Sequence, residues 1–264
     1  MPTAIFLADG CIRSWQIPFK LSPRADCSRN PRHILRANVV VFRYNSFQGL
    51  CWPLHERAMG LYATHIFPRL MDWVMSGDEF RQLRRLLLQD TRGEVLEIGF
   101  GTGLNLPHYP GGMSSLHAVD PAPLLPDRVA QRGRAVAFPI QIKQISAETL
   151  PFDDRTFDYV VSTWTLCTIP DPVKALREVR RVLKPDGVFI FLEHGRSDDA
   201  KIAAWQDRLN PIQNIIGCGC NLNRRIDQLI TEAGFKILNF DRFQMQSVPR
   251  PGGELYRGTA TRQD

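Results

Sequence analysis

Short apolar runs alternate with amphipathic segments along most of the chain after residue 58. Runs of this kind are typical of strands that are buried on both faces of a parallel sheet. On this pattern we predict seven strands, at Val95–Ile98, Leu116–Val119, Pro139–Ile145, Phe157–Thr163, Val188–Leu192, Phe235–Arg242 and Arg257–Thr261.

Apolar positions at helical spacing separate most of these strands. They predict helices at 59–74, 78–88, 129–134, 173–183 and 224–233, and a short helical turn at 104–109. Pro68 interrupts the first helix, and Asp78 is the expected N-cap of the second. This alternation predicts an α/β fold with a doubly wound, mostly parallel sheet. Because no helix separates the last two strands, we expect them to form an antiparallel pair at one edge.

The first 57 residues lack such a pattern and carry an excess of positive charge. They hold eight basic and three acidic residues, whereas the whole chain has a net charge of +6. We interpret residues 1–57 as an irregular, disordered basic extension and residues 58–264 as a single domain. An organellar transit peptide is the alternative, although Asp9 and Asp26 count against it. Because the domain itself is almost neutral, composition predicts no nucleic-acid partner.

The six cysteines and the hydropathy of the chain bear on metal sites and location. Cys218 and Cys220 form a C-x-C pair that lacks a second pair of ligands in the sequence, so we predict no metal site. Free thiols fit a reducing compartment. No stretch approaches the roughly 20 apolar residues of a transmembrane helix, and the first residues lack the apolar core of a secretory signal. The expectation is a cytoplasmic protein with no transmembrane segment.

The sequence V-L-E-I-G-F-G-T-G at 95–103 has three glycines at alternate positions after a buried strand. Glycine adopts backbone angles that other residues avoid and lets a ligand approach the main chain closely. A strand that ends in such a loop favours a nucleotide-type ligand at the carboxyl edge of the sheet, although a plain tight turn is the alternative. Glu97 places a carboxylate inside the buried run, where it requires a partner. Asp120 ends the next strand, at the interval expected for an acid that binds ribose hydroxyls.

Four segments together resemble the class I S-adenosylmethionine-dependent methyltransferases. They are E-I-G-F-G-T-G, V-D-P at 119–121, A-E-T-L-P-F at 147–152 with the strand that follows it, and L-R-E-V-R-R-V-L-K-P-D-G-V at 176–188. The resemblance extends from about residue 60 to the end of the chain. It implies a Rossmann-like sheet, S-adenosyl-L-methionine as the cofactor and a small-molecule methyl acceptor.

Three further segments are similar to the thiol S-methyltransferase-like branch of that family. They are L-C-T-I-P-D-P at 166–172, F-L-E-H-G at 191–195 and G-C-G-C-N-L-N-R at 217–224. This similarity implies a small, lipophilic acceptor such as a thiol. The alternatives are C- or O-methylation of a quinol or phenol, and a scaffold that binds the cofactor without catalysis. A nicotinamide-dependent dehydrogenase is disfavoured because the loop is G-x-G-x-G rather than G-x-G-x-x-G.

Within the first two motifs, the resemblance assigns five residues to the cofactor. Gly99, Gly101 and Gly103 would bring the main chain close to its methionyl part. Glu97 would meet the amino group, directly or through water, and Asp120 would accept hydrogen bonds from the ribose hydroxyls. Asp120 alone would suggest only the cap of a strand end, but its position after the loop favours cofactor binding.

Five more residues are expected at the adenine and at the transferred methyl group. Ala147 and Glu148 would lie beside the adenine. Ser146 stands where many relatives have an acid that bonds the adenine amine, so either Ser146 or Glu148 would supply that bond. Thr163 and Trp164, after the fourth strand, would lie near the methionine and the methyl group. Taken singly, Glu148 would be a solvated loop acid and Trp164 a core aromatic.

The sequence also offers a candidate for catalysis. A thiol reacts as its thiolate, and His194 after the fifth strand is the expected base that would form it. A histidine that only bonds the end of a strand is the alternative. We expect Cys167 to be packed rather than reactive.

Two further segments are candidates to shape the acceptor pocket. Asn221, Asn223 and Arg224 follow the C-x-C pair, although Asn223 could instead cap the next helix. The helical segment at 59–74 either covers the sheet or forms a lid over a ligand, in which case Tyr62 and Trp73 would line it.

Overall fold

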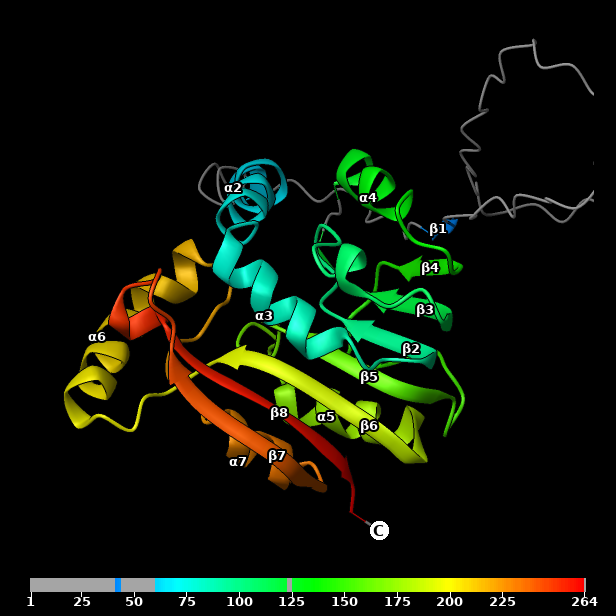
Figure 1. The fold of residues 1–264 in the computed structure, drawn as a ribbon. Coiled ribbons are helices and arrows are strands. Elements are labelled where there is room, and N and C mark those ends of the chain that lie inside the picture. The colour runs from blue at the N-terminus through cyan, green and yellow to red at the C-terminus, as the bar shows by residue number, and fades with distance from the viewer. Residues whose placement is uncertain (1–40, 44–59, 123–124, 264) are drawn as a thin grey trace, which may run out of the picture. The chain divides into compact units, whose positions relative to one another are not determined.

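A mixed sheet of eight strands lies at the centre of the computed structural model, which describes residues 41–43, 60–122 and 125–263 (Figure 1). The described residues all fall within the unit Ala37–Asp264. The strands are β1 (Val41–Arg43), β2 (Gly93–Ile98), β3 (Met113–Val119), β4 (Ile140–Lys143), β5 (Phe157–Thr163), β6 (Leu183–His194), β7 (Phe235–Gln244) and β8 (Glu254–Arg262). Their order across the sheet is β1-β4-β3-β2-β5-β6-β8-β7.

The seven strands predicted from the sequence are present as β2 to β8, and they form the predicted Rossmann-like, mostly parallel sheet. Neighbouring strands from β1 to β6 are parallel, whereas β8 is antiparallel to both β6 and β7. The expected antiparallel pair at the C-terminal edge is therefore confirmed.

The eighth strand, β1, pairs in parallel with β4 and places Phe42 opposite Ile142. It falls inside the segment that we interpret as an irregular extension. The rest of residues 1–57 lies outside the described residues, so the interpretation of that extension stays a prediction.

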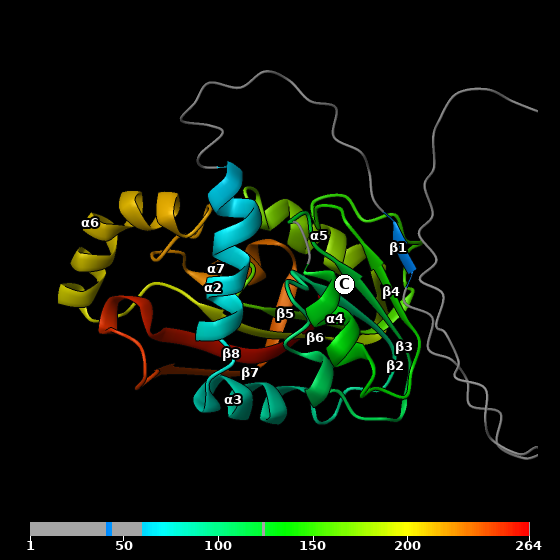
Figure 2. The same cartoon turned by 90° about the horizontal axis from the view of Figure 1, so that it is seen from above.

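Helices cover both faces of the sheet. They are η1 (Tyr62–Ile66), α2 (Phe67–Val74), α3 (Asp78–Leu88), η2 (Leu106–His108), α4 (Pro126–Gly133), α5 (Pro172–Val182), α6 (Ala200–Ile216), α7 (Ile226–Glu232) and η3 (Arg250–Gly252). On one face, Leu88 of α3 and Val129 of α4 are fully buried in one apolar cluster with residues of β2 and β3. On the other face, Leu176 of α5 and Ile230 of α7 are buried in a second cluster (Figures 1 and 2).

Local sequence explains where two of these helices begin. Asp171 caps α5, because its carboxylate accepts the N–H of Lys174 at 2.9 Å and Pro172 occupies the first turn. Asp78 was expected to cap α3 but is instead its first residue. Gly77 takes the N-cap position without a side-chain hydrogen bond, and the carboxylate of Asp78 favours the helix start through its charge alone.

Helix α6 is an element that the hydrophobic pattern did not indicate. It begins after Asp199, whose carboxylate accepts the N–H of Lys201 at 2.8 Å, and it contains Pro211. Its apolar side chains do not form one buried stripe, since Trp205 and Ile215 are 54% and 60% exposed. A helix without such a stripe leaves little periodic signal in the sequence.

Helix α2 is fastened to the glycine loop at the carboxyl edge of the sheet (Figure 2). Thr102 Oγ1 donates to Asp72 Oδ1 at 2.5 Å, and Arg132 Nη1 donates to both Asp72 Oδ1 and the carbonyl oxygen of Thr102 at 2.7 Å. The hydroxyl of Tyr62 donates to the carbonyl oxygen of Ile216 at 2.8 Å. Residues 60–74 are therefore bonded to the glycine loop, α4 and the end of α6.

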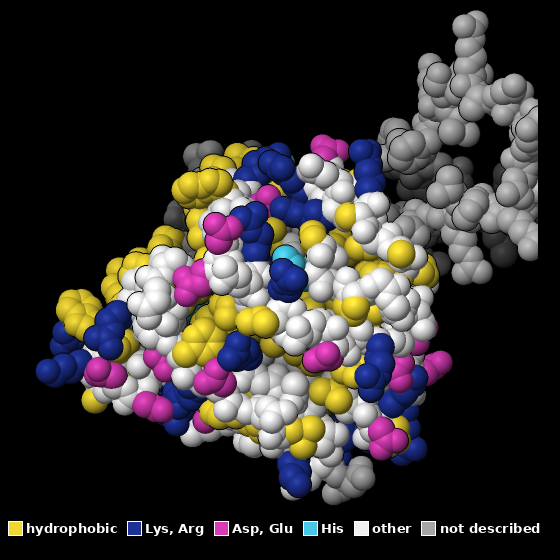
Figure 3. Space-filling model, viewed as in Figure 1, with side chains coloured by type: hydrophobic (Ala, Val, Ile, Leu, Met, Phe, Trp, Pro, Cys, Tyr) yellow, Lys and Arg dark blue, Asp and Glu magenta, His cyan; other side chains and the backbone are white. Residues whose placement is uncertain are grey.

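Several apolar side chains of this helical segment face solvent. Ile66, Leu70 and Trp73 are 57%, 42% and 75% exposed, and apolar side chains gather over α2 at the upper left of Figure 3. Trp73, a candidate to line a ligand if this segment forms a lid, is thus mostly exposed in this structure. This segment presents an apolar outer surface.

Candidate functional site

The glycine loop leaves β2 with three residues in the left-handed region, at φ of 73° for Gly99, 55° for Gly101 and 77° for Gly103. A Cβ atom at Gly99 would lie 1.8 Å from the hydroxyl oxygen of Thr165, so this glycine is required by the packing of the loop. A Cβ atom at Gly101 would meet nothing within 4 Å. The main chain at Gly101 therefore borders open space, where a ligand can approach it closely.

Glu97 is 1% exposed and bonds two side chains from the segment after the loop. Asn105 Nδ2 donates to Glu97 Oε1 at 2.9 Å, and the hydroxyl of Tyr109 donates to Oε2 at 2.8 Å. Burial raises the pKa of Glu97 to about 8, although both hydrogen bonds and the charge of Arg84 act in the opposite direction. A cationic group bound beside this carboxylate would favour its ionised form.

Asn105 joins the carboxylate to the end of β5, and sequence reasoning missed it. Its Nδ2 also donates to Thr163 Oγ1 at 3.0 Å, so it brings Glu97 and Thr163 together. Its Oδ1 atom is buried and has no hydrogen-bond partner among the described residues. A buried acceptor without a partner is unfavourable, and an N–H or O–H of a ligand would satisfy it. Its position in the turn after the three glycines is the signal that could have identified it.

Asp120 is 8% exposed at the end of β3 and fastens the glycine loop from the neighbouring strand. Its Oδ2 accepts the N–H of Gly101 at 2.7 Å, and its Oδ1 accepts the N–H of Ala122 at 2.8 Å. Burial raises the pKa of Asp120, while the two main-chain hydrogen bonds oppose that rise. The acid that follows β3 is therefore bonded directly to the glycine loop, while its expected role at the ribose stays a prediction.

The loop at 146–148 is bonded to the start of α5. Ser146 Oγ donates to Glu148 Oε2 at 3.1 Å, and Glu148 Oε1 accepts the N–H of Asp171 at 2.7 Å. Ala147 is buried in the apolar core beside Ile98. Both carboxylate oxygens of Glu148 thus have partners, and Ser146 Oγ also accepts the N–H of Glu148 at 3.2 Å. An adenine contact by either residue would therefore compete with these bonds.

Trp164 has φ of 50° and places its ring against α3. The ring centroid lies 5.3 Å from that of Phe80, and the guanidinium carbon of Arg84 lies 4.8 Å from the indole ring. Arg84 is 2% exposed, and burial lowers its pKa to about 10. The structure therefore places Thr163 in the hydrogen-bond network of Glu97 and the side chain of Trp164 between the sheet and α3.

His194 ends β6 and is 7% exposed. Its Nε2 lies 3.5 Å from Cys220 Sγ, which in turn lies 3.8 Å from Cys167 Sγ. Burial lowers the pKa of His194, but the contact with Cys220 and the neighbouring Glu193 carboxylate outweigh it, so its pKa is raised. Cys167, expected to be packed, is indeed buried, and the fold brings it and Cys220 to the same histidine.

Glu193 is a second buried carboxylate that sequence reasoning did not single out. It is fully buried, and it accepts hydrogen bonds from Ser162 Oγ at 2.6 Å and from the N–H groups of Thr165 and Leu166 at 2.7 and 3.0 Å. Burial raises its pKa to about 7. These bonds hold the turn after β5, and an acid directly after the predicted strand Val188–Leu192 was the available signal.

The segment at 217–224 packs against the same turn. Arg224 donates to the carbonyl oxygens of Leu166 and Ile169, and Asn221 Nδ2 donates to that of Cys167 at 3.0 Å. Asn223 does not cap α7, since its Nδ2 donates to Asp207 Oδ1 at 2.9 Å. Of the three expected pocket residues, Asn221 and Arg224 therefore shape the turn that carries Cys167.

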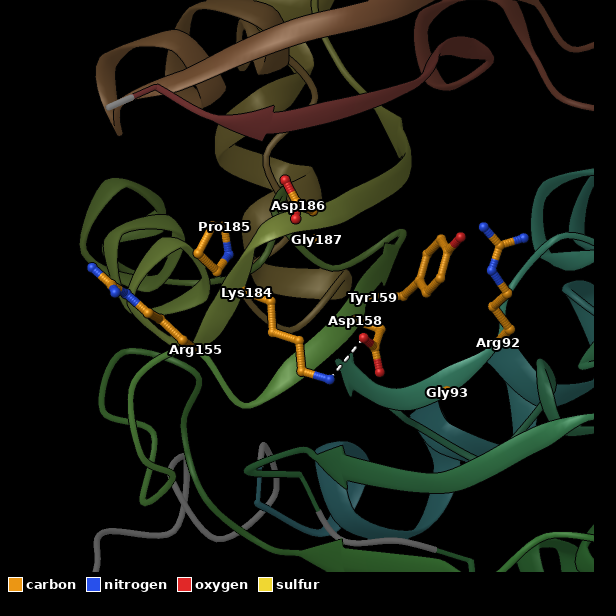
Figure 4. A pocket seen from close by; sticks show the side chains of 9 residues that line it. All are labelled: Arg92, Gly93, Arg155, Asp158, Tyr159, Lys184, Pro185, Asp186 and Gly187. Carbon is orange, nitrogen blue, oxygen red and sulfur yellow. Dashed lines mark hydrogen bonds and ion pairs between the residues drawn. The ribbon is translucent and has the colours of Figure 1, made fainter.

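An open cavity of about 530 Å³ lies at the opposite edge of the sheet, where β2, β5 and β6 begin (Figure 4). It is lined by Gly93, Asp158 and Lys184, among others, and Lys184 Nζ is paired with Asp158 Oδ1 at 2.7 Å. Asp158 Oδ2 also accepts the N–H of Glu94. Ligands of open α/β sheets bind at the carboxyl ends of the strands, so this cavity is not the expected site.

Among the described residues, no helix combines the length and the apolar character needed to cross a membrane.

Comparison with known proteins identifies relatives of the chain. Residues 96–191 match the family described as a methyltransferase domain. The chain is 33% identical over 183 residues to the thiol S-methyltransferase TMT1B of Rattus norvegicus, which covers 65% of this chain and 70% of that protein. It is 33% identical over 114 residues to the ubiquinone/menaquinone biosynthesis C-methyltransferase UbiE of Idiomarina loihiensis, covering 41% and 45%.

Among solved structures, the N-methyltransferase NodS of Bradyrhizobium japonicum, in complex with S-adenosylhomocysteine, has a TM-score of 0.55 at 17% identity, over 79% of this chain and 98% of that one. At this identity the likeness shows the shared fold. The likeness to TMT1B, by contrast, covers more than two thirds of a relative at one third identity. The chain therefore belongs to the class I S-adenosylmethionine-dependent methyltransferases, an enzyme family that uses S-adenosyl-L-methionine as its cofactor.

Proposed function

We propose that this methyltransferase transfers the methyl group to the sulfur of a small, lipophilic thiol. The observation that carries the proposal is the 33% identity to a thiol S-methyltransferase over 70% of that relative. The apolar outer surface of α2, which is bonded to the glycine loop, supports a lipophilic acceptor. Quinol C-methylation is the second candidate, favoured by the shorter similarity to UbiE.

For the cofactor, we propose that the residues of the glycine loop and the first two motifs hold it. Gly99, Gly101 and Gly103 would shape the main chain that borders the methionyl part, and Gly101 supports this because a Cβ atom there would project into open space. Glu97 would bind the amino group, for which its buried carboxylate and the unpartnered Asn105 Oδ1 are suited. When bound, S-adenosyl-L-methionine supplies an electrophilic methyl group on a sulfonium.

Three other segments complete the proposed cofactor contacts. Asp120 would accept bonds from the ribose hydroxyls with the lone pairs that its two main-chain bonds leave free. Ser146, Ala147 and Glu148 would lie at the adenine, where Ser146 Oγ or a carboxylate oxygen of Glu148 would accept a hydrogen bond from the adenine amine. Thr163 and Trp164 would border the methyl group.

The work of the chain in such a displacement is alignment and the exclusion of water. Asp72 and Thr102 hold α2 against the glycine loop, which limits access of solvent from that side. His194 lies on the acceptor side, at the end of β6 and beside the turn after β5. The thiol must lose its proton before it reacts, so this corner of the site is where the acceptor sulfur is expected.

The experiment is a panel of acceptors with labelled S-adenosyl-L-methionine. Alkyl thiols, quinols, phenols and primary amines of matched size are compared, and the labelled product is identified by mass spectrometry. Label on the sulfur of the thiols supports the proposal. Label on quinol carbon or oxygen, with none on the thiols, overturns it and favours the second candidate.

A further inference from the structure

Three potential metal ligands from distant parts of the chain meet near the carboxyl edge of the sheet. Cys167 lies in the turn after β5, His194 ends β6, and Cys220 lies in the loop after α6. Their sulfur and ring-nitrogen atoms all lie within 4.8 Å of one another. Cys167 and His194 are 2% and 7% exposed, and Cys220 is partly exposed. Such a group is more than a buried cysteine pair, because it combines ligands of two kinds.

Two of the distances match the edges of a zinc tetrahedron. Cys220 Sγ lies 3.8 Å from Cys167 Sγ and 3.5 Å from His194 Nε2. Tetrahedral bonds of about 2.3 Å to sulfur and about 2.0 Å to nitrogen place two sulfurs about 3.8 Å apart, and a sulfur and a nitrogen about 3.5 Å apart. The third pair, Cys167 Sγ and the imidazole of His194, lies within 4.8 Å, so a zinc ion between the three atoms would need to draw these two toward about 3.5 Å.

The loop that carries Cys220 is built to face Cys167. Cys218 and Gly219 have φ of 49° and 98°, which turns the chain sharply just before Cys220. Asn221 then donates through its main-chain N–H and its side-chain Nδ2 to the carbonyl oxygen of Cys167, at 2.9 and 3.0 Å. These bonds position the two cysteines next to each other, and Cys220 Sγ also donates a weak hydrogen bond to Cys167 Sγ at 3.8 Å.

The imidazole of His194 is held in place in the way of a metal ligand. In the sheet, His194 pairs with Leu255 of β8, and the imidazole also hydrogen-bonds the main chain of Asn221. Metal-binding histidines commonly have their second ring nitrogen held by a main-chain oxygen or a carboxylate. The adjacent Glu193 is not a fourth ligand, because three donors already occupy its carboxylate.

The donor set selects the ion and leaves one position free. Two thiolates balance the charge of a divalent ion, and sulfur with imidazole favours zinc over magnesium or calcium. Zinc sites with three protein ligands keep the fourth position open for water or a substrate. We propose that Cys167, His194 and Cys220 bind a Zn²⁺ ion, and that the sulfur of a thiol acceptor takes its fourth position. The second half rests on the proposed function.

Coordination would supply the thiolate that methylation of sulfur needs. The S–H bond of the acceptor breaks, its electron pair remains on the sulfur that binds the zinc, and the proton passes to solvent as the bound water leaves. In this arrangement His194 acts as a ligand, and the ion takes over the task of a base.

The test is the metal content of the full chain and of three variants, purified with a reductant and dialysed against zinc. Cys167→Ser and Cys220→Ser each remove one ligand, whereas Cys218→Ser is the matched control two positions away. We expect one zinc per wild-type chain and per Cys218→Ser chain, and a loss of at least tenfold in zinc affinity in the other two. Calorimetric binding of S-adenosylhomocysteine shows that each variant is folded.

Cobalt substitution gives the second readout. The wild-type chain loaded with Co²⁺ should show the visible absorption of a tetrahedral thiolate site, and an alkyl thiol, but not the matched alcohol, should shift it. No zinc in the reduced wild type, zinc retained by the two ligand variants, or a Cys167–Cys220 disulfide in its place overturns the metal site. A cobalt spectrum that thiols leave unchanged overturns the acceptor role alone, while the methylation panel tests the proposed function separately.

Discussion

Thr102 in the glycine loop donates a hydrogen bond of 2.5 Å to the carboxylate of Asp72 in α2. Both side chains are 8% exposed, and Arg132 of α4 bonds the same carboxylate oxygen at 2.7 Å. The residue between the second and third glycines of the motif is therefore the attachment point of the helix above it. This bond links the position of α2 to the conformation of the loop that borders the cofactor.

Asp72→Asn should loosen that attachment. The amide keeps the shape and one acceptor but loses the charge that Arg132 and Arg128 face. We expect the free energy of unfolding to fall by about 2 kcal/mol and the affinity for S-adenosylhomocysteine to fall with it, measured by chemical denaturation and calorimetry. Asp78→Asn is the control, since Asp78 pairs with Arg81 at the exposed surface and its loss should change little. Equal effects of both substitutions would contradict the attachment.

Gly101→Ala and Gly99→Ala should separate binding from folding. Both residues have positive φ, where an alanine costs about 1–2 kcal/mol. Only at Gly99 does the added Cβ also overlap Thr165. We expect Gly101→Ala to fold, to lose about that much free energy of unfolding, and to bind the cofactor at least tenfold more weakly. Gly99→Ala should be far less stable. Thermal unfolding and calorimetry measure the two effects, and a Gly101→Ala chain that binds as wild type does would exclude a ligand at this main chain.

Asp120→Asn should lower the affinity for the cofactor by about tenfold to a hundredfold, because hydrogen bonds to a charged acceptor contribute about 1.5–3 kcal/mol. The matched control is Asp158→Asn at the opposite edge of the sheet, where Asp158 pairs with the partly exposed Lys184. This control should bind S-adenosylhomocysteine as the wild type does. Calorimetry measures the affinity of the three proteins for S-adenosylhomocysteine. An equal loss of affinity in both variants would mean that the substitutions act through the stability of the fold and not through the cofactor site.

Glu97 should make stability depend on pH. Its pKa is about 8 in the folded chain, because of burial, against the usual value of 4.5. Between those values the folded chain holds a proton that the unfolded chain has released, so the free energy of unfolding declines as the pH rises and levels off above about 8. Glu97→Gln has no such proton, so denaturation at a series of pH values should show a smaller decline than in the wild type. The part that remains comes from Glu193, whose pKa burial raises to about 7.

The same carboxylate predicts proton release on binding. The cationic amino group of the cofactor favours ionised Glu97, so S-adenosylhomocysteine should bind more tightly as the pH rises toward about 8. Calorimetry in two buffers of different ionisation enthalpy measures the released protons, and Glu97→Gln should release fewer. Equal proton release by both proteins would place the amino group elsewhere.

Much of the fold could be predicted because its signals are local. A run such as Phe157–Thr163 is apolar and β-branched enough to identify a buried strand, and the missing helix before β8 indicated the antiparallel edge. Helix α6 escaped prediction because Pro211 and its exposed apolar residues leave no clear period. The N-cap of α3 was predicted at Asp78, one residue after its observed position at Gly77, because helix boundaries depend on cap geometry that a sequence alone does not specify.

The sequence by itself determined the strands β2 to β8, the glycine loop with Glu97 and Asp120, and through them the family. These depend on residues close together in the chain or at the ends of successive strands. Only the tertiary structure decided what bonds Glu97, that α2 is held by Thr102, and that Cys167, His194 and Cys220 meet. Cys167 and Cys220 are 53 positions apart, and contacts at such separation depend on how the sheet and its crossing helices pack.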